Sequence, residues 1–163
     1  MPQTSRARRR TLVAELTVAS RRSMASYALF NQAVADHVSL HPTDLQCLNL
    51  LGLEPGPVTT GRVAELTGLT TGSATRLVDR LERSGYVTRR RDTADRRRVL
   101  VETVPERMAA FGAVWEKLSG RWATIFETYD DDQLALIIDH MWRTVEVSAA
   151  QVELLRSGEL DAP

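Results

Sequence analysis

Two neighbouring stretches hold most of the side chains that could do chemistry. Residues 89–98, RRRDTADRRR, place three arginines on each side of a short polar interruption that contains two aspartates. Residues 71–83 space hydroxyls and guanidiniums at helical intervals, at Thr71, Ser73, Thr75, Arg76 and Arg80. Arginine donates paired hydrogen bonds to phosphates and to guanine O6 and N7, and small hydroxyls reach the same groups. The chemistry indicated is recognition of an anionic polymer.

Charge is concentrated within the chain and balanced over its whole length. Lysine plus arginine and aspartate plus glutamate both number 21, so the formal net charge is +0. Between Arg76 and Arg98 nine arginines stand beside four acids, a net of +5, whereas residues 99–163 have a net of −7. This separation of charge indicates that one surface of the protein binds a polyanion and that the acidic C-terminal part has another role.

Composition and motifs exclude several classes of protein. One cysteine rules out an intramolecular disulfide framework and fits a reducing compartment. No apolar run approaches the roughly 18 residues of a membrane span, and the N-terminus MPQTSRARRRTL has no signal-type apolar core. We find no phosphate loop, nucleophile elbow, paired histidine–carboxylate motif or zinc-ligand quartet. We therefore expect a cytoplasmic protein without membrane contact, enzymatic activity, cofactor or metal.

Helices are expected on the N-terminal side of these stretches. Residues 12–38 contain no proline or glycine and predict one long helix, preceded by about ten mobile residues. Thr43 and Gln46 have the spacing of a reciprocal cap and predict a short second helix that Gly52 ends. A threonine cap near Thr60 and a stop at Gly68 predict a third.

The next helix positions the hydroxyls and arginines. Its apolar residues follow the i, i+3, i+4, i+7 pattern of one buried face, at Ala74, Leu77, Val78 and Leu81, and Gly85 closes it. The opposite side then presents Ser73, Thr75, Arg76 and Arg80. Free backbone N–H groups at the helix start near Thr71 could also face a phosphate.

A β-hairpin is expected to carry the arginine clusters. YVTRRR and RRVLVETV are rich in β-branched residues and flank a five-residue connection, DTADR. Val99, Val101 and Thr103 share one face of the second strand. We expect Asp92 and Asp95 to cap backbone N–H groups in the turn and to hold a neighbouring arginine by a charge-assisted bond.

The C-terminal part is helical with two heptad seams. The first runs through Met108, Phe111, Trp115, Leu118, Trp122, Ile125 and Tyr129. After a helix start at DDDQ, the second runs through Leu134, Ile138, Met141, Val145, Ser148, Val152 and Leu155. Two such seams exceed what a small monomer can bury, so we expect a homodimer.

The middle segment has the element order of a winged helix-turn-helix, and it resembles a known family. TDLQCLNLL and VAELTGLTTGSATRLVDRLERSGYVTRRRDTADRRRVLV are similar to the MarR family of transcription regulators over about residues 40–102. The fold expected is mainly α with a small β-wing. A winged helix-turn-helix lobe (39–104) would join an N-terminal dimerisation helix (1–38) to C-terminal dimerisation helices (105–163).

The resemblance also implies a function and the residues that perform it. It implies a homodimeric repressor on a pseudo-palindromic operator in duplex DNA, often released by a small molecule of phenolic or other aromatic type. The wing signature falls on Asp95 and Arg97, with Arg97 expected in the minor groove. The complete DNA-contacting set predicted is Thr71, Ser73, Thr75, Arg76, Arg80, Arg91, Asp95 and Arg97. VETVPERM replaces the family's usual Leu-Thr and Lys-Gly after the wing, with Pro105 as a first helical residue.

The sequence is also compatible with other functions. The protein could be an architectural DNA-binding protein without an effector, or a redox- or metal-sensing regulator. Cys47 has no resolving cysteine and reads more simply as a buried small hydrophobe. His37 and His41 are four residues apart, but Pro42 argues against one helix carrying both. Four residues are candidates for an effector pocket: Tyr27, Phe30, His41 and Trp115.

Overall fold

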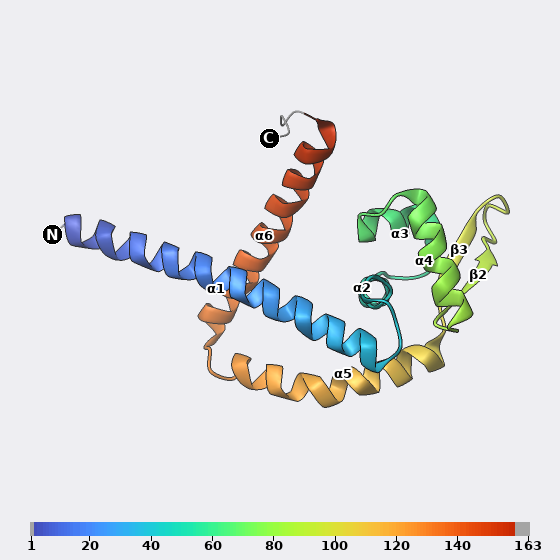
Figure 1. The fold of residues 1–163 in the computed structure, drawn as a ribbon, viewed down its shortest axis with the longest axis horizontal. Coiled ribbons are helices and arrows are strands. Elements are labelled where there is room, and N and C mark those ends of the chain that lie inside the picture. The colour runs from blue at the N-terminus through green and yellow to red at the C-terminus, as the bar shows by residue number, and fades with distance from the viewer. Residues whose placement is uncertain (1, 159–163) are drawn as a thin grey trace. The chain divides into compact units, whose positions relative to one another are not determined.

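The structure, a computed structural model, describes residues 2–158 and is shown in Figure 1. The chain forms two units, one ending at Ala109 and the other beginning at Ala110. The helices are α1 (Pro2–His37), α2 (Pro42–Leu51), α3 (Thr60–Thr67), α4 (Thr71–Arg83), α5 (Pro105–Phe126) and α6 (Asp131–Ser157). The strands are β1 (Val58–Thr59), β2 (Val87–Arg91) and β3 (Val99–Thr103). The expected fold class, mainly helical with a small β-wing, is confirmed, and residues 159–163 of the expected C-terminal segment lie outside the described residues.

The hydrophobic core of the first unit lies among α2, α3, α4 and the sheet. Each of these elements contributes side chains that are at most 2% exposed: Leu45, Cys47, Leu48, Val63, Ala74, Leu77, Val78, Leu81, Val87 and Val101. The buried face predicted for α4 is thereby confirmed, because all four of its residues are fully buried. This packing leaves the other face of α4 turned outward.

Side-chain caps and glycines set the turn between α3 and α4. Thr59 Oγ1 accepts from the Arg62 N–H at 3.1 Å and begins α3, one residue from the expected cap at Thr60. Gly68 ends α3 with φ 71°, a left-handed conformation that glycine adopts without steric cost. Thr70 Oγ1 then accepts from the Ser73 N–H at 3.3 Å and begins α4. The chain thus turns sharply into a new helix, as a helix-turn-helix requires.

The start of α2 corrects the predicted capping box. His41 is the N-cap, its Nδ1 accepting from the Thr43 N–H at 3.2 Å, and Pro42 is the first helical residue. Proline suits that position because its missing N–H would have no helical partner there. The helix therefore begins ahead of Thr43, which cannot act as the cap, while the predicted end at Gly52 is confirmed.

The sheet has one strand more than the hairpin. β3 lies between β1 and β2, and both pairings are antiparallel, with Val58 opposite Val101 and Arg89 opposite Val101 on the other side. β1 was not predicted, because a two-residue strand leaves no periodic signal. The connection between β2 and β3 covers residues 92–98. Arg97 and Arg98 therefore belong to the loop, whereas the sequence predicted them in the second strand.

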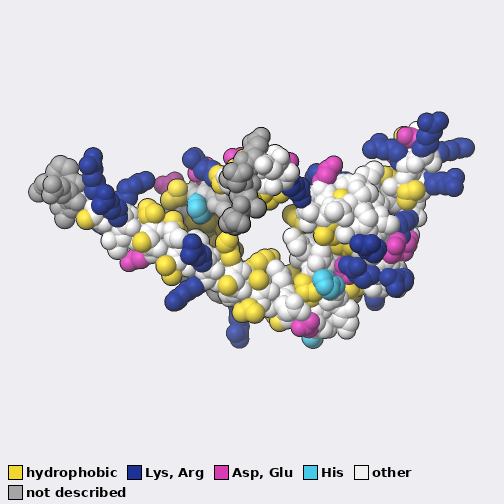
Figure 2. All heavy atoms as spheres, turned by 45° about the horizontal axis from the view of Figure 1, so that its top comes forward, with side chains coloured by type: hydrophobic (Ala, Val, Ile, Leu, Met, Phe, Trp, Pro, Cys, Tyr) yellow, Lys and Arg dark blue, Asp and Glu magenta, His cyan; other side chains and the backbone are white. Residues whose placement is uncertain are grey.

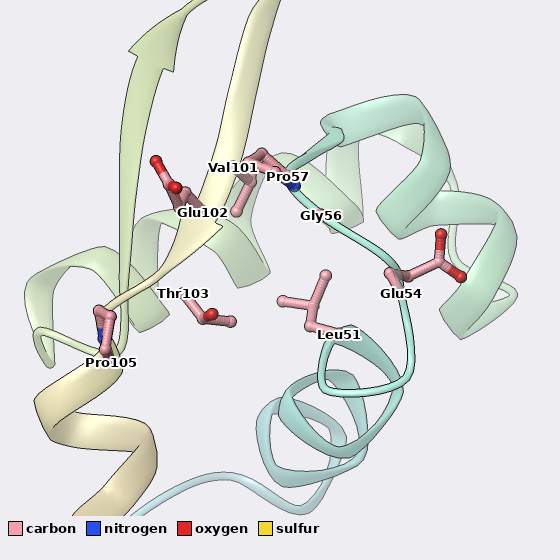
Figure 3. Close-up of a pocket in the computed structure, with 8 residues that line it drawn as sticks. All are labelled: Leu51, Glu54, Gly56, Pro57, Val101, Glu102, Thr103 and Pro105. Atoms are coloured by element: carbon pink, nitrogen blue, oxygen red, sulfur yellow. The ribbon is translucent and has the colours of Figure 1, made fainter.

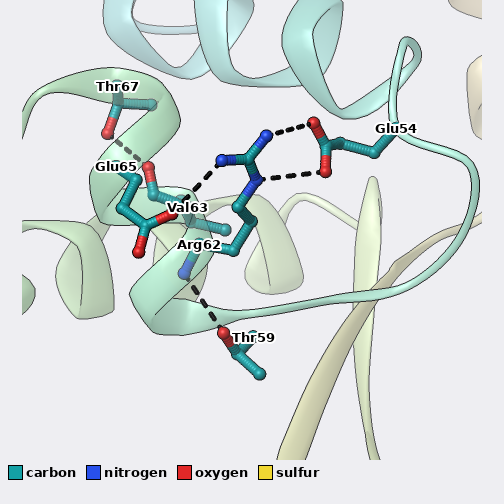
Figure 4. Close-up of polar contacts among 6 residues, drawn as sticks. All are labelled: Glu54, Thr59, Arg62, Val63, Glu65 and Thr67. Atoms are coloured by element: carbon teal, nitrogen blue, oxygen red, sulfur yellow. Dashed lines mark hydrogen bonds and ion pairs between the residues drawn. The ribbon is translucent and has the colours of Figure 1, made fainter.

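An arginine and a glutamate join the loop after α2 to α3. Arg62 Nε and Nη2 donate to the two carboxylate oxygens of Glu54 at 3.1 and 2.9 Å, and Nη1 donates to Glu65 at 3.2 Å (Figure 4). Hydrogen bonds to Glu54, and then to Glu65, raise the pKa of Arg62, so it stays charged. The same loop lines a hollow of about 190 Å³, together with Leu51, Val101 and Pro105 (Figure 3).

The start of α5 is tied to the turn that precedes the wing. Pro105 is the first residue of the helix, as predicted. Arg107 Nη2 donates to the Ser84 carbonyl at 2.9 Å, and its guanidinium lies 4.9 Å from the centre of the Tyr86 ring. A cation over an aromatic ring adds to the hydrogen bond. The unusual segment after the wing therefore still anchors α5 firmly to the hairpin base.

Helix α1 is longer at its N-terminus than expected. It begins at Pro2, ten residues before the predicted start at Leu12, and ends at His37 beside the predicted end. Val34 and Ala35 are buried near its C-terminal end, where α1 packs on α2. Ser39 (φ 56°) is the residue at which the chain reverses between these helices.

The second unit presents its large apolar side chains to the outside. Asp130 and Gln133 form a reciprocal cap at the start of α6, which confirms the start predicted at DDDQ. Nine seam residues are 37% exposed or more: Leu118, Trp122, Ile125, Tyr129, Ile138, Met141, Val145, Val152 and Leu155. Within residues 2–158, no helix is both long and apolar enough to cross a membrane.

Candidate nucleic-acid interface

The outward face of α4 carries most of the predicted helix residues. Thr71, Thr75 and Arg76 are exposed and Ser73 is half-buried. Arg76 Nη2 donates to Ser73 Oγ at 3.2 Å, and Thr75 Oγ1 donates to the Thr71 carbonyl at 2.9 Å. These side chains therefore form a continuous polar surface on the first two turns of the helix, the part that enters the major groove in a helix-turn-helix.

Arg80 stands apart from this group. Its Nε donates to Asp44 Oδ2 at 2.9 Å and its Nη2 donates to Asp44 Oδ1 at 2.5 Å, which links α4 to α2. The hydrogen bond to Asp44 raises the pKa of Arg80. Sequence reasoning missed this pair because its members are 36 residues apart. The only local signal was an acid in the first turn of α2, which helix-dipole effects explain equally well.

Two arginines of β2 are also engaged within the protein. Arg89 Nη2 donates to Asp79 Oδ1 at 2.6 Å, and its Nη1 pairs with Glu82, so β2 is bound to α4. Arg90 Nε donates to Glu102 Oε2 at 2.7 Å across the strands. These pairs fix the hairpin against the helix. They also neutralise two arginines, which lowers the net positive charge that the wing presents to a partner.

The loop of the wing is shaped by its two aspartates. Asp92 Oδ1 accepts from the Ala94 N–H at 2.8 Å, and Asp95 Oδ1 accepts from the Arg97 N–H at 3.0 Å. The predicted capping of backbone N–H groups is thereby confirmed. The predicted ion pair is absent from the described part of the chain, where neither aspartate bonds a guanidinium. Asp95 therefore sets the backbone at Arg97 and leaves its guanidinium to point outward.

Four arginines of the wing remain for contacts outside the protein. They are all exposed and sit at the end of β2 or in the loop: Arg91, Arg96, Arg97 and Arg98. Figure 2 shows basic side chains gathered around the tip of the hairpin, on the right of the view. The wing thus carries a concentrated positive charge on a structured β-ribbon, an arrangement suited to the negative potential of a DNA groove.

Two of the four pocket candidates lie next to one another on α1. Tyr27 lines a groove of about 550 Å³ between α1 and α2, and the Phe30 ring centre lies 6.3 Å from that of Tyr27. His41 serves as the cap of α2, and Trp115 belongs to the second unit. The groove is lined by Met24, Tyr27, Ala28, Asn31, Pro42, Thr43, Gln46, Asn49, Leu50 and Leu53.

Cys47 is buried in the core of α2 and its thiol is poorly suited to sensing. Burial, followed by the charge of Asp44, raises the pKa of Cys47 to about 12. The thiolate is the nucleophilic form, so the protonated thiol reacts slowly at neutral pH. The interpretation as a buried small hydrophobe fits this position.

We expect alkylation of Cys47 by iodoacetamide at pH 8 to be about 1000-fold slower in the folded protein than in urea, since each pKa unit changes the thiolate fraction tenfold. Mass spectrometry of samples quenched over time measures both rates. The same peptide in the unfolded sample is the internal control. Comparable rates in the two samples would contradict the burial of the thiol.

An outward-facing helix of a helix-turn-helix, next to an arginine-bearing β-hairpin, defines a winged-helix DNA-binding protein. Comparison with known proteins agrees, because a sequence model of the MarR family matches residues 39–98. The chain is 37% identical over 128 residues to the HTH-type transcriptional regulator YcgE of Bacillus subtilis (strain 168), covering 78% of this chain and 82% of that protein. The chain belongs to the MarR family of DNA-binding transcription regulators.

Solved structures share the fold. A MarR family protein from Bacillus stearothermophilus has a TM-score of 0.64 and 25% identity, covering 85% of this chain and 95% of that one. A MarR transcriptional regulator from Methanosarcina mazei Go1 has a TM-score of 0.62 and 20% identity, covering 83% of this chain and 98% of that one. Transcription regulation, the activity of this family, is not an enzyme class.

Proposed function

We propose that the protein is a repressor that binds a two-fold repeated operator as a homodimer and releases it on binding a small molecule. The observation that carries the proposal is the pairing of a polar outward face on α4 with a wing that keeps four exposed arginines. A helix that reads base edges in the major groove and a wing held in the adjacent minor groove together give sequence specificity.

The contacts proposed follow from this geometry. Thr71, Ser73, Thr75 and Arg76 meet base edges and phosphates in the major groove, with Arg76 the residue that can bind guanine. Arg97 enters the minor groove, where a narrow A·T-rich step attracts a guanidinium. Arg91 contacts the phosphate backbone, and Asp95 acts only through the loop conformation.

A homodimer is supported by the apolar surface of α5 and α6. Trp122, Ile125, Met141 and Val145 are each 44% exposed or more, although they lie on heptad seams. Surfaces of this kind normally mark an interface between proteins. We propose that α5 and α6, together with α1, form the dimerisation region and that the lobe between them binds DNA.

Selection from random duplexes tests the proposal. The full-length protein is incubated with a randomised duplex pool, and the bound fraction is amplified and sequenced. We expect a two-fold repeat whose half-sites are centred about one helical turn, roughly 34 Å, apart. Recovery of duplexes without a consensus would replace the repressor with an architectural DNA-binding protein.

The effector we propose is uncharged and partly aromatic or apolar. No charged residue contributes to the groove between α1 and α2 among the residues described, and its polar atoms are amides and hydroxyls such as those of Asn31, Thr43 and Gln46. Asn31 lines this groove, and its Oδ1 is buried without a hydrogen-bond partner among the described residues, so a rotation of the side chain would let it accept a hydrogen bond from a ligand.

Thermal unfolding with neutral phenols and with phenolic carboxylates tests this assignment. Binding to the folded state raises the midpoint in proportion to the logarithm of ligand concentration. We expect the neutral phenols to stabilise the protein more, and the substitution Asn31→Leu to remove the difference. Stabilisation by the carboxylates alone would contradict the proposed ligand class.

A further inference from the structure

The ion pair between Asp44 and Arg80 differs from the other arginine pairs described in how deeply its carboxylate is buried. The Asp44 side chain is only 4% exposed, whereas Arg80 is 41% exposed. Both carboxylate oxygens are bonded, at 2.9 and 2.5 Å, by two nitrogens of one guanidinium. A carboxylate that is nearly buried is costly unless it is paired, and the arginine fork satisfies both of its oxygens at once.

The pair provides directional contact between α2 and α4. The two helices also meet through buried leucines, among them Leu45, Leu48 and Leu77, but apolar contacts have little directional preference. Two parallel hydrogen bonds to a planar guanidinium specify both the rotation and the position of α4 along its axis. The outward face of α4 depends on that rotation.

The pairing with Asp44 restricts how Arg80 could contact DNA. It uses one N–H of Nε and one of Nη2, so a guanine or a phosphate could meet only the outer edge of the guanidinium, in the one orientation that Asp44 imposes. Swinging the guanidinium away would leave a nearly buried carboxylate unpaired. The charges of the two side chains also cancel, so the pair adds little net attraction for phosphates.

We propose that Asp44 and Arg80 are positioning residues for DNA recognition: together they hold α4 in its binding orientation on α2, and Arg80 makes no DNA contact of its own. The inference rests on the proposed function, because it assigns to Arg80 a role within the same interface. It replaces the prediction from sequence that Arg80 belongs to the contacting face.

The test compares Asp44→Asn, Arg80→Gln, Arg80→Lys and the double variant Asp44→Asn/Arg80→Gln with the unaltered protein. Affinity for the selected duplex is measured by fluorescence anisotropy across a series of salt concentrations. Circular dichroism at the same temperature verifies that each variant is folded. The double variant keeps the experiment informative if a single variant unfolds, since it leaves no unpaired buried charge.

We expect each single substitution to weaken DNA binding about tenfold, which corresponds to the coupling free energy typical of two interacting side chains. The double variant should bind no more weakly than the weaker of the two single variants. Arg80→Lys should bind DNA as weakly as Arg80→Gln, because an ammonium retains the charge but lacks the two adjacent N–H groups of the guanidinium. In all of these variants the slope of log affinity against log salt should equal that of the unaltered protein. Arg97→Ala, the positive control, should reduce the slope by about 0.9.

Three results would overturn the positioning role. The first is a higher affinity for the selected duplex in Asp44→Asn. The second is a slope of log affinity against log salt that is reduced by about 0.9 in Arg80→Gln. The third is that all variants bind the duplex with the affinity of the unaltered protein. The first two would make Arg80 a DNA contact that Asp44 restrains. Failure of the unaltered protein to select any duplex would count against the proposed function itself, and is seen before any variant is made.

Discussion

Replacing Val145 with glutamate is expected to convert the proposed homodimer into monomers. Val145 lies in the middle of the α6 seam and is 56% exposed in the single chain. In a two-fold interface the substitution buries two carboxylates without partners, each at a cost of several kcal/mol. At about 1.4 kcal/mol per decade, the dissociation constant of the dimer should rise about 1000-fold or more. Sedimentation velocity at micromolar concentration measures the change.

Val147→Glu is the matched control for this substitution. Val147 is 61% exposed, similar to Val145, but two residues along a helix place it on nearly the opposite face. The control should remain dimeric and retain its affinity for DNA. The monomeric Val145→Glu variant should bind the selected duplex far more weakly, because the two half-sites are no longer linked. A dimer that persists in Val145→Glu would refute the assigned seam.

Arg97→Ala should weaken binding to the selected duplex by roughly 10- to 100-fold, the range of 1–3 kcal/mol that specific arginine contacts provide. The guanidinium is exposed, and the loop that carries it is shaped by the Asp95 contact to the Arg97 N–H. Removing the side chain leaves that backbone contact intact. The loss should therefore be confined to DNA binding, with thermal stability and dimerisation unchanged. Anisotropy titrations measure the affinity for DNA, thermal unfolding measures the stability, and sedimentation velocity measures dimerisation.

Arg90→Ala provides the comparison within the same hairpin. Arg90 is paired with Glu102 across the strands, so less of its charge is available to DNA. Its removal should reduce affinity clearly less than the removal of Arg97. Equal effects of the two substitutions would mean that the wing acts by total charge and that no single arginine enters the groove.

Seven of the nine arginines between residues 76 and 98 fall into two groups with different roles. Arg80, Arg89 and Arg90 pair with carboxylates and connect α2, α4 and the strands. The exposed group, Arg91 and residues 96–98, lies toward the end of the wing. The first group fixes the strands that carry the second group against α4. Arginines that look alike in the sequence therefore have two roles: some stabilise the fold, and the others are exposed for contacts with a partner.

Local features of this protein were determined by the sequence alone. The buried face of α4, the stop at Gly68, the cap at Asp130 and the backbone caps in the wing follow from periodicity and turn chemistry. Each depends on residues within about one or two helical turns. Short-range preferences of this kind can be recognised before the chain is folded.

Only the tertiary structure decided which polar groups meet. Sequence patterns placed Arg80 on the outward face of its helix, but its partner Asp44 is 36 residues away. The two-residue strand β1 and the cap at His41 were likewise missed, because neither has a periodic signal of its own. An arginine selects its partner by the burial and direction of nearby carboxylates, and those are fixed when the hydrophobic core brings α2, α4 and the wing together.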